Sequence, residues 1–140
     1  MQQLIKKLFF VAFSGWIVLF AGTVNSQPKH DFPIALGQSK AIANTNLMIK
    51  FKAVLEDSRC PVNAFCTMPG NGRIELEVID THGNSESVVL NTDEEPKSKI
   101  VMDYQMTLVS LSPQRVEGKS FSGNDYSITL RVERRKTDDK

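Results

Sequence analysis

The sequence predicts an all-β fold, a small antiparallel β-sandwich, immunoglobulin-like or similar, with about six to seven strands. Apolar and polar residues alternate along several short segments, as expected of strands that bury one face and expose the other. Turn-forming residues separate these segments at short intervals. After residue 26, no segment of the sequence has the period of a helix.

Residues 1–26 are predicted to be an export signal peptide. Lys6 and Lys7 precede an apolar run over 8–22, and small or polar residues lead to an expected cleavage site after Ser26. An uncleaved membrane anchor is the alternative, but the apolar run is shorter than the roughly 20 residues that span a bilayer as a helix. Contact with a membrane is therefore expected only through this leader, if the leader is kept.

Cleavage after Ser26 leaves one predicted β-sandwich domain over 27–140. The full chain has 17 lysines and arginines against 16 aspartates and glutamates, and Lys6 and Lys7 are the only charged residues of the leader. The mature chain therefore carries 15 basic against 16 acidic side chains, a net charge of −1. Such a balance gives no support to a nucleic-acid partner.

The two cysteines predict a single disulfide, because compartments outside the cytosol are oxidising. The sequence contains no Asn-x-Ser/Thr acceptor, so nothing indicates glycosylation in a eukaryotic secretory pathway. We therefore expect a bacterial protein that is periplasmic or secreted.

The first expected strand covers 32–37, and Pro33 is expected either at a sheet edge or among the first positions of the strand. A turn over 37–39 follows. The clearest strand is expected over 47–55, where every second residue is apolar and lysines occupy positions between them. The residues expected on its buried face are Leu47, Ile49, Phe51, Ala53 and Leu55.

The next two strands are expected to form a hairpin. Residues 73–78 alternate between charged and aliphatic side chains, residues 81–84 have the composition of a tight turn, and residues 87–90 form the returning strand. The charges of 73–78 then lie outward and its aliphatic side chains face the core.

Residues 100–111 are expected to form one long strand whose apolar pattern changes face along its length. A β-bulge near Leu108 reconciles the two halves, because one extra residue reverses the facing of all that follow. Pro113 ends this strand, and residues 114–125 are expected to be a long loop or a short irregular hairpin. The last strand covers 126–132.

The stretch 57–72 prescribes the most unusual local geometry of the chain, since it holds both cysteines. A bridge between Cys60 and Cys66 closes a ring with five residues between them. In the loop-entropy model this ring adds about 2 to 2.5 kcal/mol of stability. A bridge over so short a distance shapes a loop more than it staples the domain, and a purely structural stiffening of this connection remains an open alternative.

Two groups of residues within this stretch have predicted roles. Asp57 and Ser58 are expected to accept hydrogen bonds from backbone N–H groups at the base of the loop. The residues expected to shape the loop are Asp57, Ser58, Pro61, Gly70 and Asn71. The candidate contact residues are Arg59, Val62, Asn63, Phe65 and Met68.

The motif Asp57-Ser58-Arg59-Cys60-Pro61, followed by Cys66 and by Gly70-Asn71, resembles a family of small exported bacterial proteins of unknown function. The resemblance covers nearly the whole mature chain. It implies a shared fold and export, and it implies no reaction. Members of that family commonly carry a tryptophan two residues after the second cysteine, where this chain has Met68.

The sequence indicates a protein that is not an enzyme and needs no cofactor. A disulfide consumes both thiols, so no cysteine nucleophile remains. A serine nucleophile would depend on His30 in an expected tail or on His82 in a turn, and no Gly-x-Ser-x-Gly motif is present.

The leading interpretation is a binding module that presents the stiffened loop to an unknown protein or envelope component, and an inhibitor is one concrete form of it. The alternative is a periplasmic copper-handling protein, because methionine and histidine are ligands for that metal. In that alternative Met102 and Met106 share a strand face. The other ligand candidates are Met48, Met68, His30 and His82.

Overall fold

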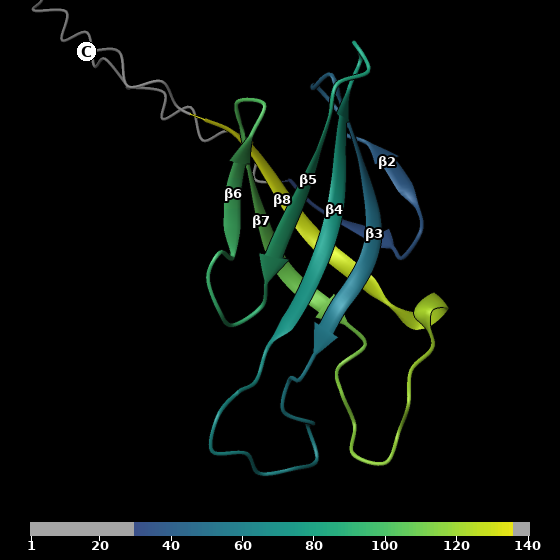
Figure 1. Ribbon diagram of the computed structural model, residues 1–140, viewed down its shortest axis with the longest axis vertical. Helices are drawn as coiled ribbons and strands as arrows, with labels where there is room; N and C mark the ends of the chain where they lie inside the picture. Colours follow the sequence, from purple (N-terminus) through teal and green to yellow (C-terminus); the bar gives the residue numbers. More distant parts are fainter. Residues whose placement is uncertain (1–29, 136–140) are drawn as a thin grey trace, which may run out of the picture.

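The computed structural model describes residues 30–135, which form two four-stranded antiparallel sheets that pack face to face (Figure 1). The predicted signal peptide over 1–26 lies outside the described residues. Within the described range, no helix has both the length and the apolar character needed to cross a bilayer. The prediction of an all-β sandwich is confirmed.

The first sheet has the strand order β1, β8, β7, β6 and the second has the order β2, β3, β4, β5. Within the described range, the chain changes sheet only after β1 and after β5, a simpler connectivity than that of immunoglobulin domains. The first sheet comprises β1 (His30–Ala35), β8 (Ser127–Arg134), β7 (Tyr104–Ser112) and β6 (Ser98–Val101). The second comprises β2 (Ser39–Ala41), β3 (Leu47–Asp57), β4 (Gly72–Asp80) and β5 (Ser85–Asn91).

The core lies between the sheets and is built from the inward face of each alternating strand. In β4, Ile74, Leu76 and Val78 are fully buried, while the charged residues between them face outward, as predicted. The other fully buried large side chains are Ile49, Phe51, Val88, Leu90, Val101, Met106, Ile128, Leu130 and the polar Asn71. With one phenylalanine among these side chains, the core is chiefly aliphatic.

The residues predicted to lie on the buried face of β3 are buried up to Phe51, and the prediction is wrong beyond that residue. The pairing with β4 shifts register between Phe51 and Ala53 and again between Val54 and Glu56. These irregularities turn Val54 toward the core and leave the side chain of Leu55 45% exposed. Leu55 is therefore a surface residue.

The single strand predicted over 100–111 is in fact a hairpin of β6 and β7. Together with β2, which was not predicted and begins at Ser39 in the expected turn, this split brings the six strands predicted one by one to eight. Met102 and Asp103 form its two-residue turn with φ of 49° and 66°, as a type I′ turn requires. The predicted bulge is present, with a register shift between Leu108 and Ser110. It leaves Val109 exposed and returns Leu111 to the core.

Three connections gather at one end of the sandwich, the lower end in Figure 1. They are the β3–β4 loop (58–71), the β5–β6 loop (92–97) and the β7–β8 loop (113–126), which includes a short 3-10 turn, Gly123–Asp125. The β4–β5 turn lies at the opposite end. There Asp80 accepts hydrogen bonds from the backbone of His82 and Asn84 at 2.8 and 2.9 Å, which confirms the predicted tight turn.

We expect Leu76→Ala to lower the free energy of unfolding by about 2–5 kcal/mol, because it leaves a cavity at a fully buried site on β4, an inner strand of the second sheet. Val89→Ala, on the outer face of β5, should cost no more than about 1 kcal/mol. Urea unfolding followed by circular dichroism measures both. Equal costs for the two variants would contradict the assignment of the sheet faces.

Candidate functional site

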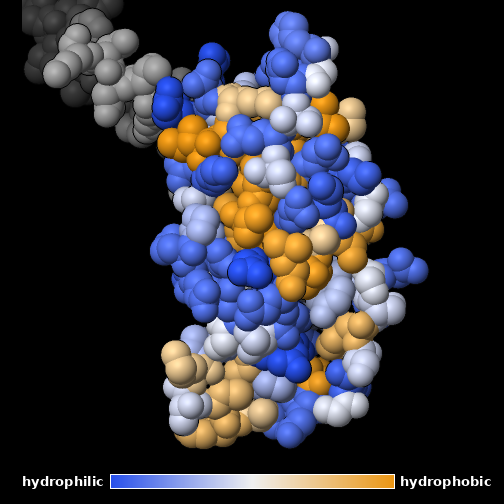
Figure 2. Space-filling model, viewed as in Figure 1, coloured by the Kyte–Doolittle hydropathy of each residue, from blue (hydrophilic) through white to orange (hydrophobic). Residues whose placement is uncertain are grey.

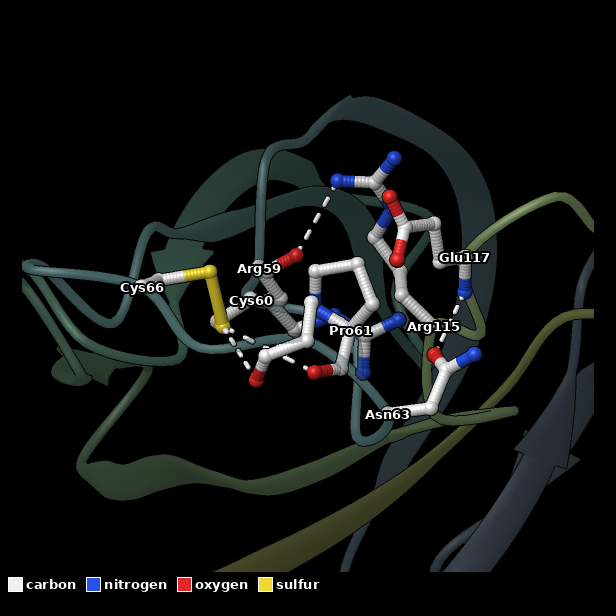
Figure 3. Close-up of a disulfide and its surroundings, with 8 residues drawn as sticks. Arg59, Cys60, Pro61, Asn63, Cys66, Arg115 and Glu117 are labelled. Carbon is white, nitrogen blue, oxygen red and sulfur yellow. Dashed lines mark hydrogen bonds between the residues drawn. A yellow bond between two sulfur atoms is a disulfide. The ribbon is translucent and has the colours of Figure 1, made fainter.

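The predicted disulfide is present in the β3–β4 loop. Cys60 and Cys66 are bonded, with their Cα atoms 6.0 Å apart (Figure 3). Cys60 Sγ also lies 3.6 and 3.7 Å from the carbonyl oxygens of Pro61 and Ala64. A bonded sulfur has no hydrogen to donate, so these two approaches are close packing inside the ring.

The base of the loop is a cluster of Asp57, Arg59 and Tyr126. Arg59 donates from Nε and Nη2 to the two carboxylate oxygens of Asp57 at 2.7 and 2.8 Å, a bidentate pair. The Tyr126 hydroxyl donates to Asp57 Oδ2 at 3.0 Å. The Asp57 carboxylate accepts mainly from these two side chains, and the backbone N–H of Arg59 adds a smaller contribution of the predicted kind.

Arg59 has two further acceptors, one at the end of β7 in the other sheet and one in the loop directly after it. Its Nη1 donates to the carbonyl oxygen of Leu111, and its Nη2 donates to that of Pro113 at 2.8 Å. The Arg59 side chain is only 13% exposed. Arg59 thus joins the end of β3 to the end of β7, and it braces the loop from within instead of lying among its exposed contact residues.

These contacts lower the pKa of Asp57 and raise the pKa of Tyr126. Burial by itself would raise the pKa of Asp57, but the hydrogen bonds and charge of Arg59, with the Tyr126 hydroxyl, outweigh it and hold that pKa below its usual value. Burial, the hydrogen bond to Asp57 and the charge of Asp57 raise the pKa of Tyr126. The cluster therefore favours an ionised carboxylate and a neutral phenol at neutral pH.

The strand ends that flank the loop are held together by Ser58 and Asn71. Ser58 N donates to the carbonyl oxygen of Asn71 at 2.8 Å, and Asn71 N donates to Ser58 Oγ at 3.1 Å. The predicted capping role of Ser58 is confirmed. Gly70 lies between these contacts with φ of 70°, and an added Cβ would lie 1.8 Å from the carbonyl oxygen of Ser58.

The Asn71 side chain ties the loop to its neighbour between β5 and β6. It is 1% exposed, and its Nδ2 donates to Asn91 Oδ1 at 2.9 Å. Its Oδ1 accepts from the backbone N–H of Asp93 at 3.3 Å. Asn71 therefore shapes the loop, as predicted, through a buried amide pair that burial makes costly to break.

The disulfide ring rests on the β7–β8 loop (Figure 3). Val62 N donates to the carbonyl oxygen of Arg115 at 2.9 Å, and Arg115 Nη1 donates to that of Arg59 at 3.0 Å. Asn63 Oδ1 accepts from the backbone N–H of Glu117 at 2.7 Å. Asn63, a predicted contact residue, thus uses its side-chain oxygen to dock the ring.

The remaining predicted contact residues are exposed. The exposed fractions are 61% for Val62, 99% for Phe65 and 75% for Met68. Figure 2 shows apolar residues gathered at the same lower end of the molecule. Beside the ring lies an open hollow of about 290 Å³, lined by Arg59, Cys60, Val62, Pro69, Asp93, Gln114 and Arg115.

Three residues of the site were not among the predicted ones: Asn91, Arg115 and Tyr126. Each acts through a partner 20 or more positions away in the sequence, such as the 69 positions between Tyr126 and Asp57. Local periodicity carries no signal for such contacts. A polar residue directly after the apolar run 88–90, as Asn91 is, was the one available hint.

The structure does not bring the candidate copper ligands together. Met106 is fully buried in the core, and Met102 lies in the β6–β7 turn, so the two do not share a strand face as predicted. His82 is in the β4–β5 turn, at the end opposite to Met68 (Figure 1). The side chain of His30 lies outside the described part. Among the residues described, no group of three His, Cys, Asp or Glu side chains could hold a metal ion.

The chain matches no protein-family model, and no curated protein or solved structure is significantly similar to it. The fold and the site define a small β-sandwich protein with one disulfide-closed loop at its lower end. A disulfide of this kind is compatible with a location outside the cytosol.

We expect Gly70→Ala to destabilise the protein by at least about 2 kcal/mol, because alanine meets both the unfavourable positive φ and the Ser58 carbonyl. The matched control is Gly118→Ala, where φ is 78° but nothing lies within 4 Å of the added Cβ. Chemical unfolding should show the larger loss for Gly70→Ala. Equal losses would mean that the close approach at Ser58 is absent in solution.

The Asp57 cluster predicts a specific pH dependence. A carboxylate whose pKa is lowered by folding stabilises the native state above its unfolded pKa of about 3.9, and this contribution is lost as the pH falls through the folded value. We therefore expect Asp57→Asn to cost about 1–3 kcal/mol at pH 7, and the gap to the wild type to narrow below about pH 4.

Urea unfolding between pH 7 and pH 2.5 measures this difference. Asp103→Asn is the control, since that side chain is 76% exposed, and its stability should run parallel to the wild type at every pH. A gap for Asp57→Asn that stays constant down to pH 2.5 would contradict the assignment.

Proposed function

We propose that the protein is a non-enzymatic exported binding module that engages a protein partner through residues 65–68, the tip of the disulfide loop. The observation that carries this proposal is Phe65, whose side chain is 99% exposed on a loop that is otherwise tightly braced. A large aromatic side chain held fully in water costs solvation free energy that burial against a partner recovers.

The bracing supports a binding role for the tip. The disulfide closes the ring, Asn63 and Val62 dock it on the β7–β8 loop, and Arg59 fixes its base. A loop that is ordered before it meets a partner loses less conformational entropy on binding, so more of the contact energy appears as affinity. Phe65 has the character of the aromatic anchors that dominate protein interfaces.

Export is part of the proposal. The expected leader and its cleavage after Ser26 would deliver the mature domain to the periplasm or the medium of a bacterium, where the Cys60–Cys66 bond persists. The resemblance to small exported bacterial proteins supports the same location. The partner is then an envelope or extracellular protein.

The experiment is site-specific photo-cross-linking in the producing bacterium, with the cross-linker at position 65 or, as a control, at Ile100, which is 48% exposed on β6. We expect a defined adduct from position 65 that excess wild-type protein competes away. Phe65→Ala should weaken capture at least about 30-fold, the effect of losing a hot-spot side chain.

The same Phe65→Ala variant should keep its melting temperature within about 1 °C of the wild type, because the side chain packs against nothing in the folded domain. Ile100→Ala should retain capture. Equal adducts from both positions, or none from position 65, would show that the loop only completes the fold.

A further inference from the structure

We infer that the tip binds in the active-site cleft of a peptidase that cleaves after aromatic residues, with Phe65 in its primary pocket and the Phe65–Cys66 peptide bond at its catalytic centre. This inference rests on the proposed binding role and names the class of partner. The tip would act as a slowly processed substrate analogue, and the protein as an inhibitor.

The first observation is that the exposed backbone next to Phe65 has no hydrogen-bond partner within the described domain. Within the described residues, the N–H and C=O groups of 65–68 form no hydrogen bond with the rest of the chain, whereas Cys60 N, on the inner side, donates to the carbonyl oxygen of Pro69 at 2.7 Å. Peptidase clefts bind substrates by pairing extended backbone on one side and filling a side-chain pocket on the other. The tip offers a fully exposed side chain at Phe65 and, at 65 and 66, backbone that lies between the turn over 62–63 and the bend over 67–68.

The second observation is the charge of the tip. Residues 60–72 contain no ionisable side chain other than the bonded cysteines. A neutral aromatic anchor suits an uncharged, apolar primary pocket, such as the hydrophobic slot of chymotrypsin. A membrane is the less suitable occupant, because surface binding draws on basic residues and unpaired backbone groups are costly in lipid.

The third observation is the position that the two new chain ends would have after cleavage of the Phe65–Cys66 peptide bond. The peptidase nucleophile would add to the Phe65 carbonyl carbon, its proton would pass to the Cys66 nitrogen, and the C–N bond would break to give an acyl-enzyme and a free amine. The disulfide holds that amine to Cys60. Attack of the amine on the ester re-forms the peptide bond and returns the proton to the enzyme.

Both sides of the bond are also anchored to the sandwich. The Phe65 side is held through Asn63 Oδ1, which accepts from Glu117 N at 2.7 Å, and through Val62 N, which donates to the carbonyl oxygen of Arg115 at 2.9 Å. The Cys66 side is held by the disulfide and by Pro69. A cut would therefore release neither end, and re-formation competes with hydrolysis.

The test is inhibition of three serine peptidases by the oxidised, exported protein: chymotrypsin and subtilisin, which accept aromatic residues, and trypsin, which requires a basic one. We expect competitive, reversible inhibition of at least one of the first two and none of trypsin. Phe65→Ala should weaken it at least about 30-fold. Phe65→Lys should transfer the inhibition to trypsin, and Ile100→Ala should change nothing.

Cys60→Ser/Cys66→Ser separates inhibition from simple cleavage. Without the tether the loop should be cut after Phe65, with a new N-terminus at position 66 found by mass spectrometry. The inference is overturned if neither the wild type nor Phe65→Lys inhibits, or if the wild type is cleaved rapidly and irreversibly. It is also overturned if Phe65-dependent binding to anionic vesicles is found instead of inhibition. If the cross-link at position 65 persists without inhibition, the proposed function stands and the peptidase does not.

Discussion

The guanidinium of Arg59 is the group on which the arrangement of the loops depends. It pairs with Asp57 at the end of β3 and reaches the carbonyl oxygens of Leu111 and Pro113 at the end of β7. One side chain thus bridges the two sheets where their connections leave the core. Arginine suits this place because its planar donors serve a carboxylate and two carbonyls at once, which the ammonium of lysine cannot do.

The β3–β4 loop has a base in which polar side chains are hydrogen-bonded and a tip that is exposed to solvent. Polar side chains near the base are hydrogen-bonded to one another. Asp57 accepts from Arg59 and Tyr126, and Asn71 donates to Asn91. Toward Phe65 the protein contacts end and the apolar side chain meets water. Order at the base and exposure at the tip support the proposed contact role, because a loop that is already ordered loses less conformational entropy on binding.

The strands could be predicted from the sequence wherever alternation was regular, as in β4, because burial of one face is a local pattern. The prediction failed at Leu55 and at Met102, where a register shift and a turn without glycine leave no compositional mark. In the site, the disulfide, Ser58 and Gly70 followed from local chemistry. Arg115 and Tyr126 did not, since their partners are brought near only by the packing of the two sheets.

A tip that is ordered in the free protein is the central requirement of this account. Backbone ¹⁵N relaxation of the oxidised, unbound protein measures it directly at the amides of Phe65 and Met68. A braced tip should give order parameters close to the value of about 0.85 found in rigid backbone. The order parameters of both amides should be lower in Cys60→Ser/Cys66→Ser. Order parameters below about 0.6 in the oxidised protein would contradict it.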